Sequence, residues 1–203
     1  GGERESRKRR GKADIHIHSA TGDALPTVEE IIEHVERDTD LDVVAITDHD
    51  ELDGGFEARN LAEKRGYRVE VIPGCEITTL DGHLIALDIE SPIRMLQSME
   101  KTIEAVHRQG GFCIVPHPMS WLTLSAGYRV LLRVSASPSE LIFFDGIETF
   151  NPSIAGRVAH ERAKQANRER LGLAEIGGSD AHHLHLVGTA YTSFDGRTAD
   201  DFR

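Results

Sequence analysis

The stretch Ala13-Asp14-Ile15-His16-Ile17-His18 alternates apolar and polar side chains, a pattern typical of a β-strand. Successive side chains of a strand point to opposite faces, so His16 and His18 share one face. A lone histidine in a strand is usually a satisfied core residue, but two on one face are costly to bury without a partner such as a metal ion. We therefore interpret this pair as metal ligands at the end of a strand.

Motifs of the same kind follow apolar runs later in the chain: Thr47-Asp48-His49, Gly82-His83, Pro116-His117-Pro118 and Ser179-Asp180-Ala181-His182. Glu76 lies inside the apolar run 72–77, where a carboxylate needs a counter-ion. Asp23, in a loop five residues after His18, is on its own more typical of a turn. Imidazoles mixed with carboxylates, with no thiolates among them, suit zinc, manganese or iron. The recurrence predicts a hydrolytic site with several metal ions.

Short apolar runs alternate with helical patterns along the chain. The expected strands lie near residues 13–18, 42–47, 68–72, 75–79, 83–89, 112–116, 145–150, 174–177 and 189–194, and the expected helices near 27–38, 54–66, 96–109 and 154–171. Residues 119–145 are expected to form a loop with a helical piece. This alternation predicts an α/β fold whose sheet is closed or nearly closed into a barrel. The motifs fall at strand ends, where catalytic groups converge in such barrels.

Composition predicts one acidic domain. The 203 residues, 39% of them hydrophobic, can fill one core. The formal net charge is -11, but residues 1–12 hold six basic and two acidic residues, which leaves -15 on the other 191. Such a body repels extended phosphate backbones, so we expect no binding of duplex DNA. We expect residues 1–12 to be a flexible basic segment and residues 13–203 to be a single domain.

Two further features bear on location. No apolar run approaches the roughly 20 residues that cross a membrane, and no apolar stretch typical of a signal peptide follows the basic segment. Cys75 and Cys113 are the only cysteines and lack CxxC spacing, so we expect two reduced thiols in a cytoplasmic protein. Residues 198–203 have the pattern of a helix that has just begun, which a truncated chain would also show.

The motifs taken together resemble those of the polymerase and histidinol phosphatase (PHP) superfamily, in the order HxH, ITDHD, PGCE, His83, PHP and GSDAH. The resemblance runs from about Ala13 to Phe194 and is closest to small stand-alone phosphoesterases that act on nucleotides and short RNA. It implies a distorted seven-stranded (β/α) barrel of the TIM type that binds up to three metal ions. Stand-alone relatives often insert a small domain near the PHP motif, but residues 119–145 are too few for one.

The resemblance also implies a set of ligands for each metal. The first metal would be held by His16, His18, Glu76 and Asp180. The second would share Glu76 as a bridge and add His83 and His117. The third would be held by Asp23, His49 and His182.

From these ligands we expect a hydroxide shared by two metals to attack phosphorus, because bound metals lower the pKa of water to about 7. Glu76, Asp180, His117 and Asp48 are the expected catalytic residues. Asp14 and Asp48 are expected to orient histidines. Arg157 is a candidate phosphate clamp, although a surface arginine is the commoner reading, and His185 is a further candidate substrate contact. His34, His107 and His160 are expected on helix surfaces.

The expected function is hydrolysis of phosphate esters of small nucleotides or of the 5′ ends of short oligonucleotides. A C–N hydrolase of the amidohydrolase type is the main alternative, because such barrels also begin with HxH and end with a metal-binding aspartate. Histidinol-phosphate phosphatase is another, and a PHP module that has lost catalysis is the third. The sequence predicts no membrane partner and leaves the oligomeric state open.

Overall fold

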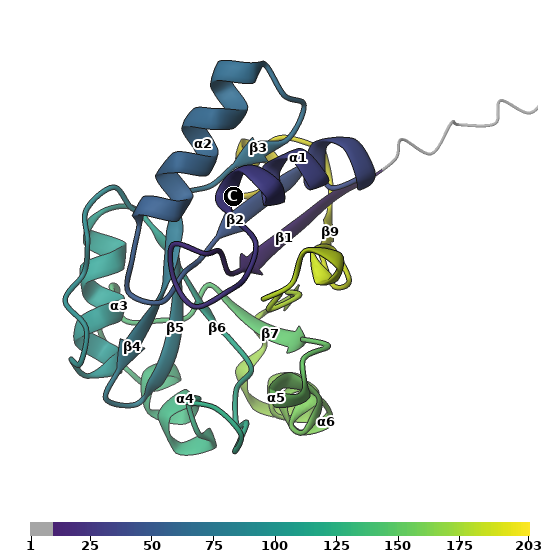
Figure 1. Cartoon of the computed structure of the whole chain (residues 1–203). Coiled ribbons are helices and arrows are strands. Elements are labelled where there is room, and N and C mark those ends of the chain that lie inside the picture. The colour runs from purple at the N-terminus through teal and green to yellow at the C-terminus, as the bar shows by residue number, and fades with distance from the viewer. Residues whose placement is uncertain (1–9) are drawn as a thin grey trace, which may run out of the picture.

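The protein has an α/β fold in which helices surround two β-sheets, and its structure, a computed structural model, describes residues 10–203 (Figure 1). The strands are β1 (Gly11–Ile17), β2 (Val43–Ile46), β3 (Glu70–Val71), β4 (Gly74–Thr79), β5 (Gly82–Leu87), β6 (Phe112–Val115), β7 (Gly146–Phe150), β8 (Ala174–Gly177) and β9 (Thr192–Phe194). The helices are α1 (Val28–Asp38), α2 (Asp53–Arg65), α3 (Met99–Arg108), α4 (Tyr128–Ser135), α5 (Ile154–Arg157), α6 (His160–Ala166) and α7 (Ala199–Phe202), with a π-helical turn at Asn167–Leu171 and a 3₁₀ turn at Leu184–Leu186.

Each predicted strand is present, although several are shorter than expected. Strand β1 begins at Gly11, so Gly11 and Lys12 belong to the sheet and not to the basic segment, whose residues 1–9 lie outside the described residues. Cys75 and Cys113 are buried and free. Within residues 10–203, none of the helices is both long and apolar enough to cross a membrane.

The strands form one sheet in the order β3-β2-β1-β9 and a second in the order β4-β5-β6-β7-β8. In the first sheet β1, β2 and β3 are parallel, and β9 is antiparallel to β1. In the second, β6, β7 and β8 are parallel, whereas β5 is antiparallel to both of its neighbours. The reversal of β5 brings its amino end to the edge where the neighbouring strands have their carboxyl ends.

The distorted seven-stranded barrel, predicted to be closed or nearly closed, is not confirmed, because the hydrogen-bonded strands form two separate sheets. Isolated bridges between Ile17 and Ala181 and between His49 and Glu76 connect the two sheets near the carboxyl ends of β1 and β2. Towards the amino ends, β9 pairs with the first residues of β1 and β3 pairs with β2. These two short strands occupy the edges that closure would need.

Helix α1 shows how local sequence positions the elements around the sheets. Its apolar residues recur at intervals of three and four and are buried against the first sheet: Val28, Ile31, Ile32 and Val35. The helix begins where predicted, because the Thr27 hydroxyl accepts the Glu30 N–H at 3.1 Å. Helix α2 ends at Gly66, whose φ of 62° is the left-handed conformation that glycine adopts at low cost.

The predicted single helix over residues 154–171 is wrong. The segment consists of α5, α6 and the π-helical turn, with a break at residues 158–159. His160 Nε2 accepts a hydrogen bond from the Asn151 N–H at 2.7 Å and holds the start of α6 against the end of β7. The helical piece expected within residues 119–145 is present as α4.

Candidate metal centre

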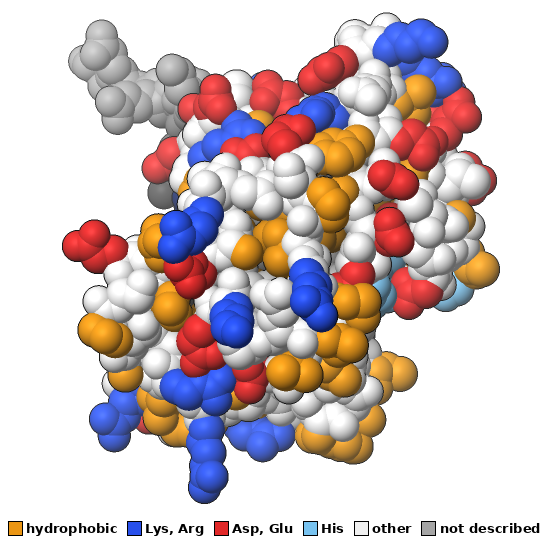
Figure 2. Space-filling model, turned by 90° about the vertical axis from the view of Figure 1, so that its left-hand side faces the viewer, with side chains coloured by type: hydrophobic (Ala, Val, Ile, Leu, Met, Phe, Trp, Pro, Cys, Tyr) orange, Lys and Arg blue, Asp and Glu red, His pale blue; other side chains and the backbone are white. Residues whose placement is uncertain are grey.

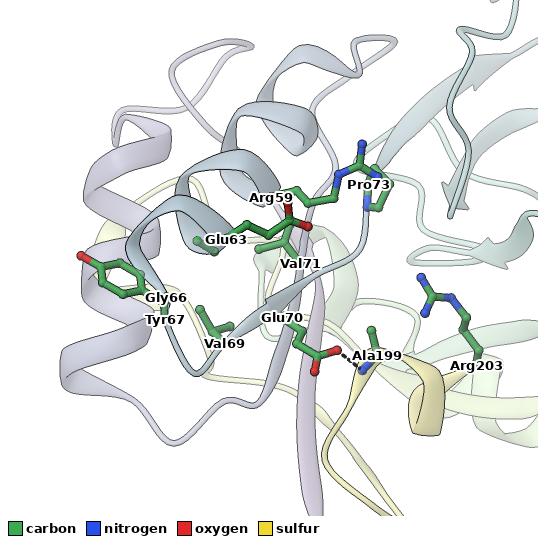
Figure 3. Close-up of a pocket in the computed structure, with 11 residues that line it drawn as sticks. Arg59, Glu63, Gly66, Tyr67, Val69, Glu70, Val71, Pro73, Ala199 and Arg203 are labelled. Carbon is green, nitrogen blue, oxygen red and sulfur yellow. Dashed lines mark hydrogen bonds between the residues drawn. The ribbon is translucent and has the colours of Figure 1, made fainter.

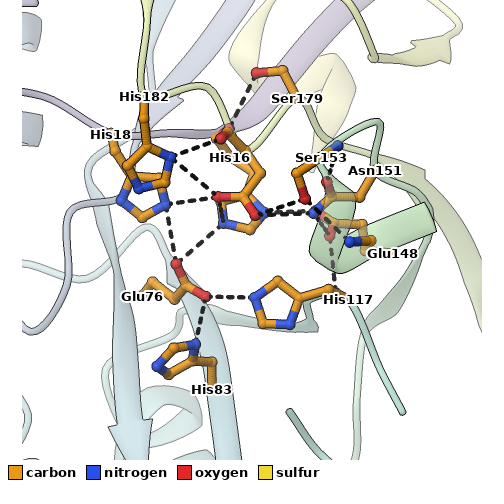
Figure 4. Close-up of polar contacts among 12 residues, drawn as sticks. His16, His18, Glu76, His83, His117, Glu148, Asn151, Ser153, Ser179 and His182 are labelled. Atoms are coloured by element: carbon orange, nitrogen blue, oxygen red, sulfur yellow. Dashed lines mark hydrogen bonds and ion pairs between the residues drawn. The ribbon is translucent and has the colours of Figure 1, made fainter. Parts of the chain in front are cut away.

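Nine predicted ligands lie together at the edge where the two sheets are bridged. Strand β1 carries His16, β4 carries a glutamate, and the start of β5 carries one histidine. His18 directly follows β1, and loops after β1, β2, β6 and β8 carry the rest. Figure 4 shows most of this cluster, with a glutamate from β4 in the middle of the imidazoles. The nine residues are His16, His18, Asp23, His49, Glu76, His83, His117, Asp180 and His182.

The first group is formed by His16 of β1, by His18 directly after this strand, and by two carboxylates. His16 Nε2 lies 3.1 Å from Glu76 Oε2 and 3.2 Å from Asp180 Oδ1. His18 Nε2 lies 3.1 Å from each of the same two oxygens. Both imidazoles are fully buried. One nitrogen or oxygen from each of the four residues lies within 4.8 Å of the others, so a single ion fits among them.

The second group faces the other oxygen of Glu76. His83 Nδ1 and His117 Nε2 each lie 3.0 Å from Glu76 Oε1. His49 Nδ1 is 3.7 Å from Glu76 Oε2, and His49, Glu76 and His83 form a further compact set of possible ligands. His83 takes part because the reversed strand β5 starts at this edge, and His117 because it directly follows β6.

The third group is the most open to solvent. His182 Nε2 lies 3.3 Å from Asp23 Oδ1, and His49 Nε2 lies 3.9 Å from Asp23 Oδ2. His18 Nδ1 lies 3.9 Å from Asp23 Oδ1, so the His18 ring stands between the first group and the third. The Asp23 side chain is more than half exposed, which leaves room for a substrate to approach from this side.

Unsatisfied nitrogens show that the residues fit metal ions. Three buried ring nitrogens have no hydrogen-bond partner among the described residues: Nδ1 and Nε2 of His18, and Nδ1 of His83. The short distances from His18 and His83 to carboxylate oxygens lack hydrogen-bond geometry. A buried polar atom without a partner costs about 1–3 kcal/mol. Nitrogen lone pairs and carboxylate oxygens converging on the same points are the donor set of a divalent ion.

The electrostatics of the cluster indicate the same need for positive charge. Burial alone would raise the pKa of Glu76, but the charge of His16 and hydrogen bonds from His117 and His16 hold it well below its ordinary value. Burial alone would lower the pKa of His18, but contacts with Asp180 and Glu76 raise it to about 9. Without metal ions the histidines would therefore bind protons to balance the carboxylates.

Glu148 belongs to the centre but was not predicted. It is buried on β7, and its Oε2 lies 2.7 Å from His16 Nδ1. Its Oε1 accepts the N–H of His117 at 2.9 Å and the side-chain amide of Asn151 at 2.7 Å. The signal was a glutamate inside the apolar run 146–150, the same signal that identified Glu76.

Asn151 connects Glu148 to the first group of ligands. Its side-chain nitrogen also lies 3.2 Å from Asp180 Oδ2, and the Ser153 hydroxyl lies 3.4 Å from the same oxygen. Asp180 and His117 have φ values of 54° and 29°, which cost non-glycine residues about 1–3 kcal/mol. Hydrogen bonds from this network stabilise both residues in those conformations.

Asp14 and Asp48 do not contact an imidazole by a hydrogen bond, contrary to the prediction that they orient histidines. Asp14 accepts the backbone N–H groups of His16, Ser179 and Gly188, and burial raises its pKa to about 6. Asp48 accepts the N–H and the hydroxyl of Ser19, each at 2.6 Å. Both carboxylates hold the loops that carry ligands, because the hydrogen bonds run to backbone or to a loop serine.

The remaining candidates lie around or away from the centre. Arg157 and His185 are exposed, and neither side chain has a polar contact with a ligand in the described part of the chain. His107 was predicted to lie on a helix surface, and this prediction is wrong. Its Nε2 lies 2.8 Å from Asp145 Oδ2, and its Nδ1 lies 2.8 Å from the Leu141 carbonyl oxygen. His34 is on the surface, beside Asp38.

A pocket of about 560 Å³ between α2, β3 and α7 contains none of the predicted site residues (Figure 3). Its arginines already have partners, since Arg59 Nη1 lies 2.7 Å from Glu90 Oε1 and Arg203 Nε lies 2.6 Å from Asp88 Oδ2. We assign no part of the site to this pocket.

Comparison with known proteins identifies the family. The chain matches the PHP domain over residues 14–172 and a PHP-associated domain over residues 157–203. It is 36% identical over 151 residues to an uncharacterized protein of Methanocaldococcus jannaschii, which covers 69% of this chain and 81% of that protein. It is 32% identical over 81 residues to the 5′-3′ exoribonuclease Rnm of Salmonella typhimurium, over 38% of this chain and 27% of that protein.

A solved structure has a similar fold. It is a two-domain protein of Bacteroides vulgatus that contains a predicted PHP-like metal-dependent phosphoesterase, superimposes with a TM-score of 0.68 at 22% identity, and covers 94% of this chain and 60% of its own. The match to the PHP domain spans most of the chain and includes the strand-end motifs from β1 to β7. The chain therefore belongs to the PHP domain family.

Proposed function

We propose that the chain hydrolyses phosphate esters of small nucleotides, or of the 5′ ends of short oligonucleotides, at a centre of three divalent metal ions. The observation that supports this most directly is the position of Glu76. Its Oε2 faces the imidazoles of His16 and His18, and its Oε1 faces those of β5 and of the loop after β6. A carboxylate that bridges two groups of imidazoles is the arrangement of a two-metal hydrolytic site.

The ligand sets follow the groups of side chains. The first ion would be held by His16, His18, Glu76 and Asp180, the second by Glu76, His83 and His117, and the third by Asp23, His49 and His182. Manganese, zinc and iron are the proposed ions, because imidazole and carboxylate ligands suit them. The bound ions would lower the pKa of water to about 7 and neutralise phosphate charge.

Residues outside the ligand sets prepare the centre. Glu148 accepts a hydrogen bond from His16 Nδ1, so the lone pair of Nε2 points to Glu76 and Asp180. Ser125 Oγ lies 2.7 Å from His117 Nδ1 and orients the His117 ring in the same way. Asn151 holds Asp180 and Glu148 together. Preorganised ligands of this kind avoid reorganisation during the reaction.

Small substrates are favoured by the charge of the body. Outside residues 1–12 the chain carries a formal charge of -15, which repels a long phosphate backbone. A mononucleotide or an RNA end brings only a few phosphates to the cationic centre. The relative named as a 5′-3′ exoribonuclease supports RNA ends as one substrate class. Family membership favours phosphate esters over the C–N bonds of the amidohydrolase alternative.

A substrate screen tests the proposal. Purified protein loaded with manganese, and separately with zinc or iron, is assayed for phosphate release from phosphomonoesters, nucleoside bisphosphates, cyclic nucleotides, histidinol phosphate and short 5′-phosphorylated RNA. We expect turnover of nucleotides or RNA ends, and its loss after chelation. Preferred turnover of histidinol phosphate would assign the alternative phosphatase function, and the absence of turnover with every metal and ester would contradict the proposal.

A further inference from the structure

The rim of the metal centre carries an exposed apolar surface with a single aromatic ring. Trp121, the only tryptophan of the chain, is 71% exposed, and Leu80 is 70% exposed. Leu122 and Leu124 are also exposed. Apolar side chains are also exposed on the face of the molecule that Figure 2 shows. Exposed apolar side chains that line one groove are a sign of a binding surface.

The loop that carries Trp121 is attached to the metal centre at both ends. It begins at His117, and Met119 N–H donates to the Ala126 carbonyl at 2.8 Å, which closes the loop. On the return, Ser125 Oγ lies 2.7 Å from His117 Nδ1, and the Leu124 carbonyl accepts the His83 N–H at 3.1 Å. Four residues span at most about 14 Å, so the Trp121 backbone lies within that distance of His117.

The loop and the β4–β5 hairpin border a shallow, open groove of about 540 Å³, lined by residues 80–82 and 121–125. This volume lies within the range of about 300–1,000 Å³ that small-ligand sites span. The one carboxylate of the groove, Asp81, is already paired, with Arg133 Nη2 at 3.1 Å and the Met99 N–H at 2.8 Å. The groove therefore offers an uncharged surface beside a centre that binds phosphate.

We infer that Trp121 stacks on a nucleobase of the substrate whose phosphate is at the metal centre, an inference that rests on the proposed function and defines its substrate class. A nucleobase is flat and uncharged, so the acidic body does not repel it, and it is covalently tied to the phosphate that the metals would bind. Leu80 and Leu122 would contact the edges of the base. Aromatic stacking of this kind tolerates any base.

Fluorescence tests the inference without any turnover, because Trp121 is the only tryptophan. Metal-loaded protein is titrated with AMP and, separately, with ribose 5-phosphate, which has the same phosphate and sugar but no base. We expect AMP to quench the tryptophan emission in a saturable way and ribose 5-phosphate to bind without quenching. Emission that does not respond to AMP would overturn the inference.

Kinetics with variants of the loop test the same contact. Trp121→Ala should lower kcat/KM for a nucleotide by about 5- to 150-fold, mainly by raising KM. The same substitution should leave kcat/KM for a base-free phosphate ester unchanged. Trp121→Phe should restore most of the loss. Tyr191→Ala removes another exposed aromatic ring, beside the amino end of β1, and should change kcat/KM for neither substrate. An equal loss for both substrates, or no loss for either, would overturn the inference.

The outcomes separate the two proposals. Quenching by AMP without turnover of any ester would contradict the proposed function and retain the nucleobase site. If base-free esters are hydrolysed but the tryptophan emission does not change on addition of AMP, the nucleobase site alone would be contradicted. If a second copy of the chain covered this surface, sedimentation would show a dimer that the Trp121→Ala substitution dissociates. Such a dimer, together with tryptophan emission that does not change on addition of AMP, would replace the nucleobase as the occupant of the groove.

Discussion

Glu148 Oε2 lies 2.7 Å from His16 Nδ1, and both side chains are fully buried. The contact joins β7 to β1, which belong to different sheets. With Nδ1 donating to the carboxylate, the lone pair of Nε2 is directed to the oxygens of Glu76 and Asp180. Glu148 therefore determines which nitrogen of His16 is available to a metal ion.

Glu148→Gln should weaken metal binding by about 10- to 100-fold, the usual loss when the hydrogen-bond partner of a ligand is changed. The amide lacks the charge that favours an Nδ1–H donor. Competition with a chromophoric chelator measures the affinity. Glu100→Gln, which changes a glutamate paired with Arg133 on the surface, is the matched control and should bind metal normally. Equal affinities in the two variants would contradict the role of Glu148.

Metal content is the second prediction. Because nine ligands form three groups, the purified protein should carry two to three divalent ions per chain and lose hydrolysis when they are chelated. Elemental analysis of protein prepared with excess metal measures the content. At most one ion per chain under these conditions would rule out three occupied groups.

Glu76 and Asp48 should behave differently when substituted. Glu76→Ala removes the carboxylate that faces two groups of imidazoles, so we expect turnover to be abolished and metal content to fall. Asp48→Asn perturbs only the hydrogen bonds to Ser19, so metal should be retained while catalysis slows. Metal analysis and initial rates on the same preparations distinguish them. Undiminished turnover in Glu76→Ala would refute the bridging role.

Substrate length is the fourth prediction. Mononucleotides or short 5′-phosphorylated oligonucleotides should have the highest kcat/KM, because longer chains lay more phosphates against a body of charge -15. Added salt should barely weaken their binding, since few counterions are released. Rates measured against length and against salt test this. A kcat/KM that rises steadily with length and falls steeply with salt would indicate a nuclease that tracks along nucleic acid.

The fifth prediction concerns pH and stability. Burial alone would lower the pKa of His107, but hydrogen bonds with Asp145 and the Leu141 carbonyl raise it above its ordinary value of 6.5. Protonated His107 therefore stabilises the fold at pH below 6.5, and this contribution is lost as pH rises through the raised pKa. His107→Gln should thus lower the free energy of unfolding more at pH 5.5 than at pH 9.

Urea unfolding of both proteins across this range measures the effect in the fifth prediction. His34→Gln, which changes a partly exposed histidine beside Asp38, is the control and should alter the free energy of unfolding by less than about 0.5 kcal/mol at each pH. A difference between wild type and His107→Gln that is constant with pH would contradict the prediction.

Much of the centre was predictable because its signals are local. His16 and His18 were identified from the period of two in one strand, and Glu76 from an acid within an apolar run. Glu148 carries the same signal as Glu76 and could have been found by it. The orienting role predicted for Asp14 and Asp48 was wrong, because the atoms that a carboxylate contacts depend on distant backbone.

Local patterns were enough to predict that strands end in histidines and carboxylates, since hydrophobic period and strand-end position depend on neighbouring residues alone. The remaining features depend on contacts between distant parts of the chain. Strand β5 runs in reverse and brings His83 to the centre, and β3 and β9 occupy the edges that would close a barrel. The His16–Glu148 contact joins residues 132 positions apart. Such pairings depend on how two sheets meet, which no local pattern encodes.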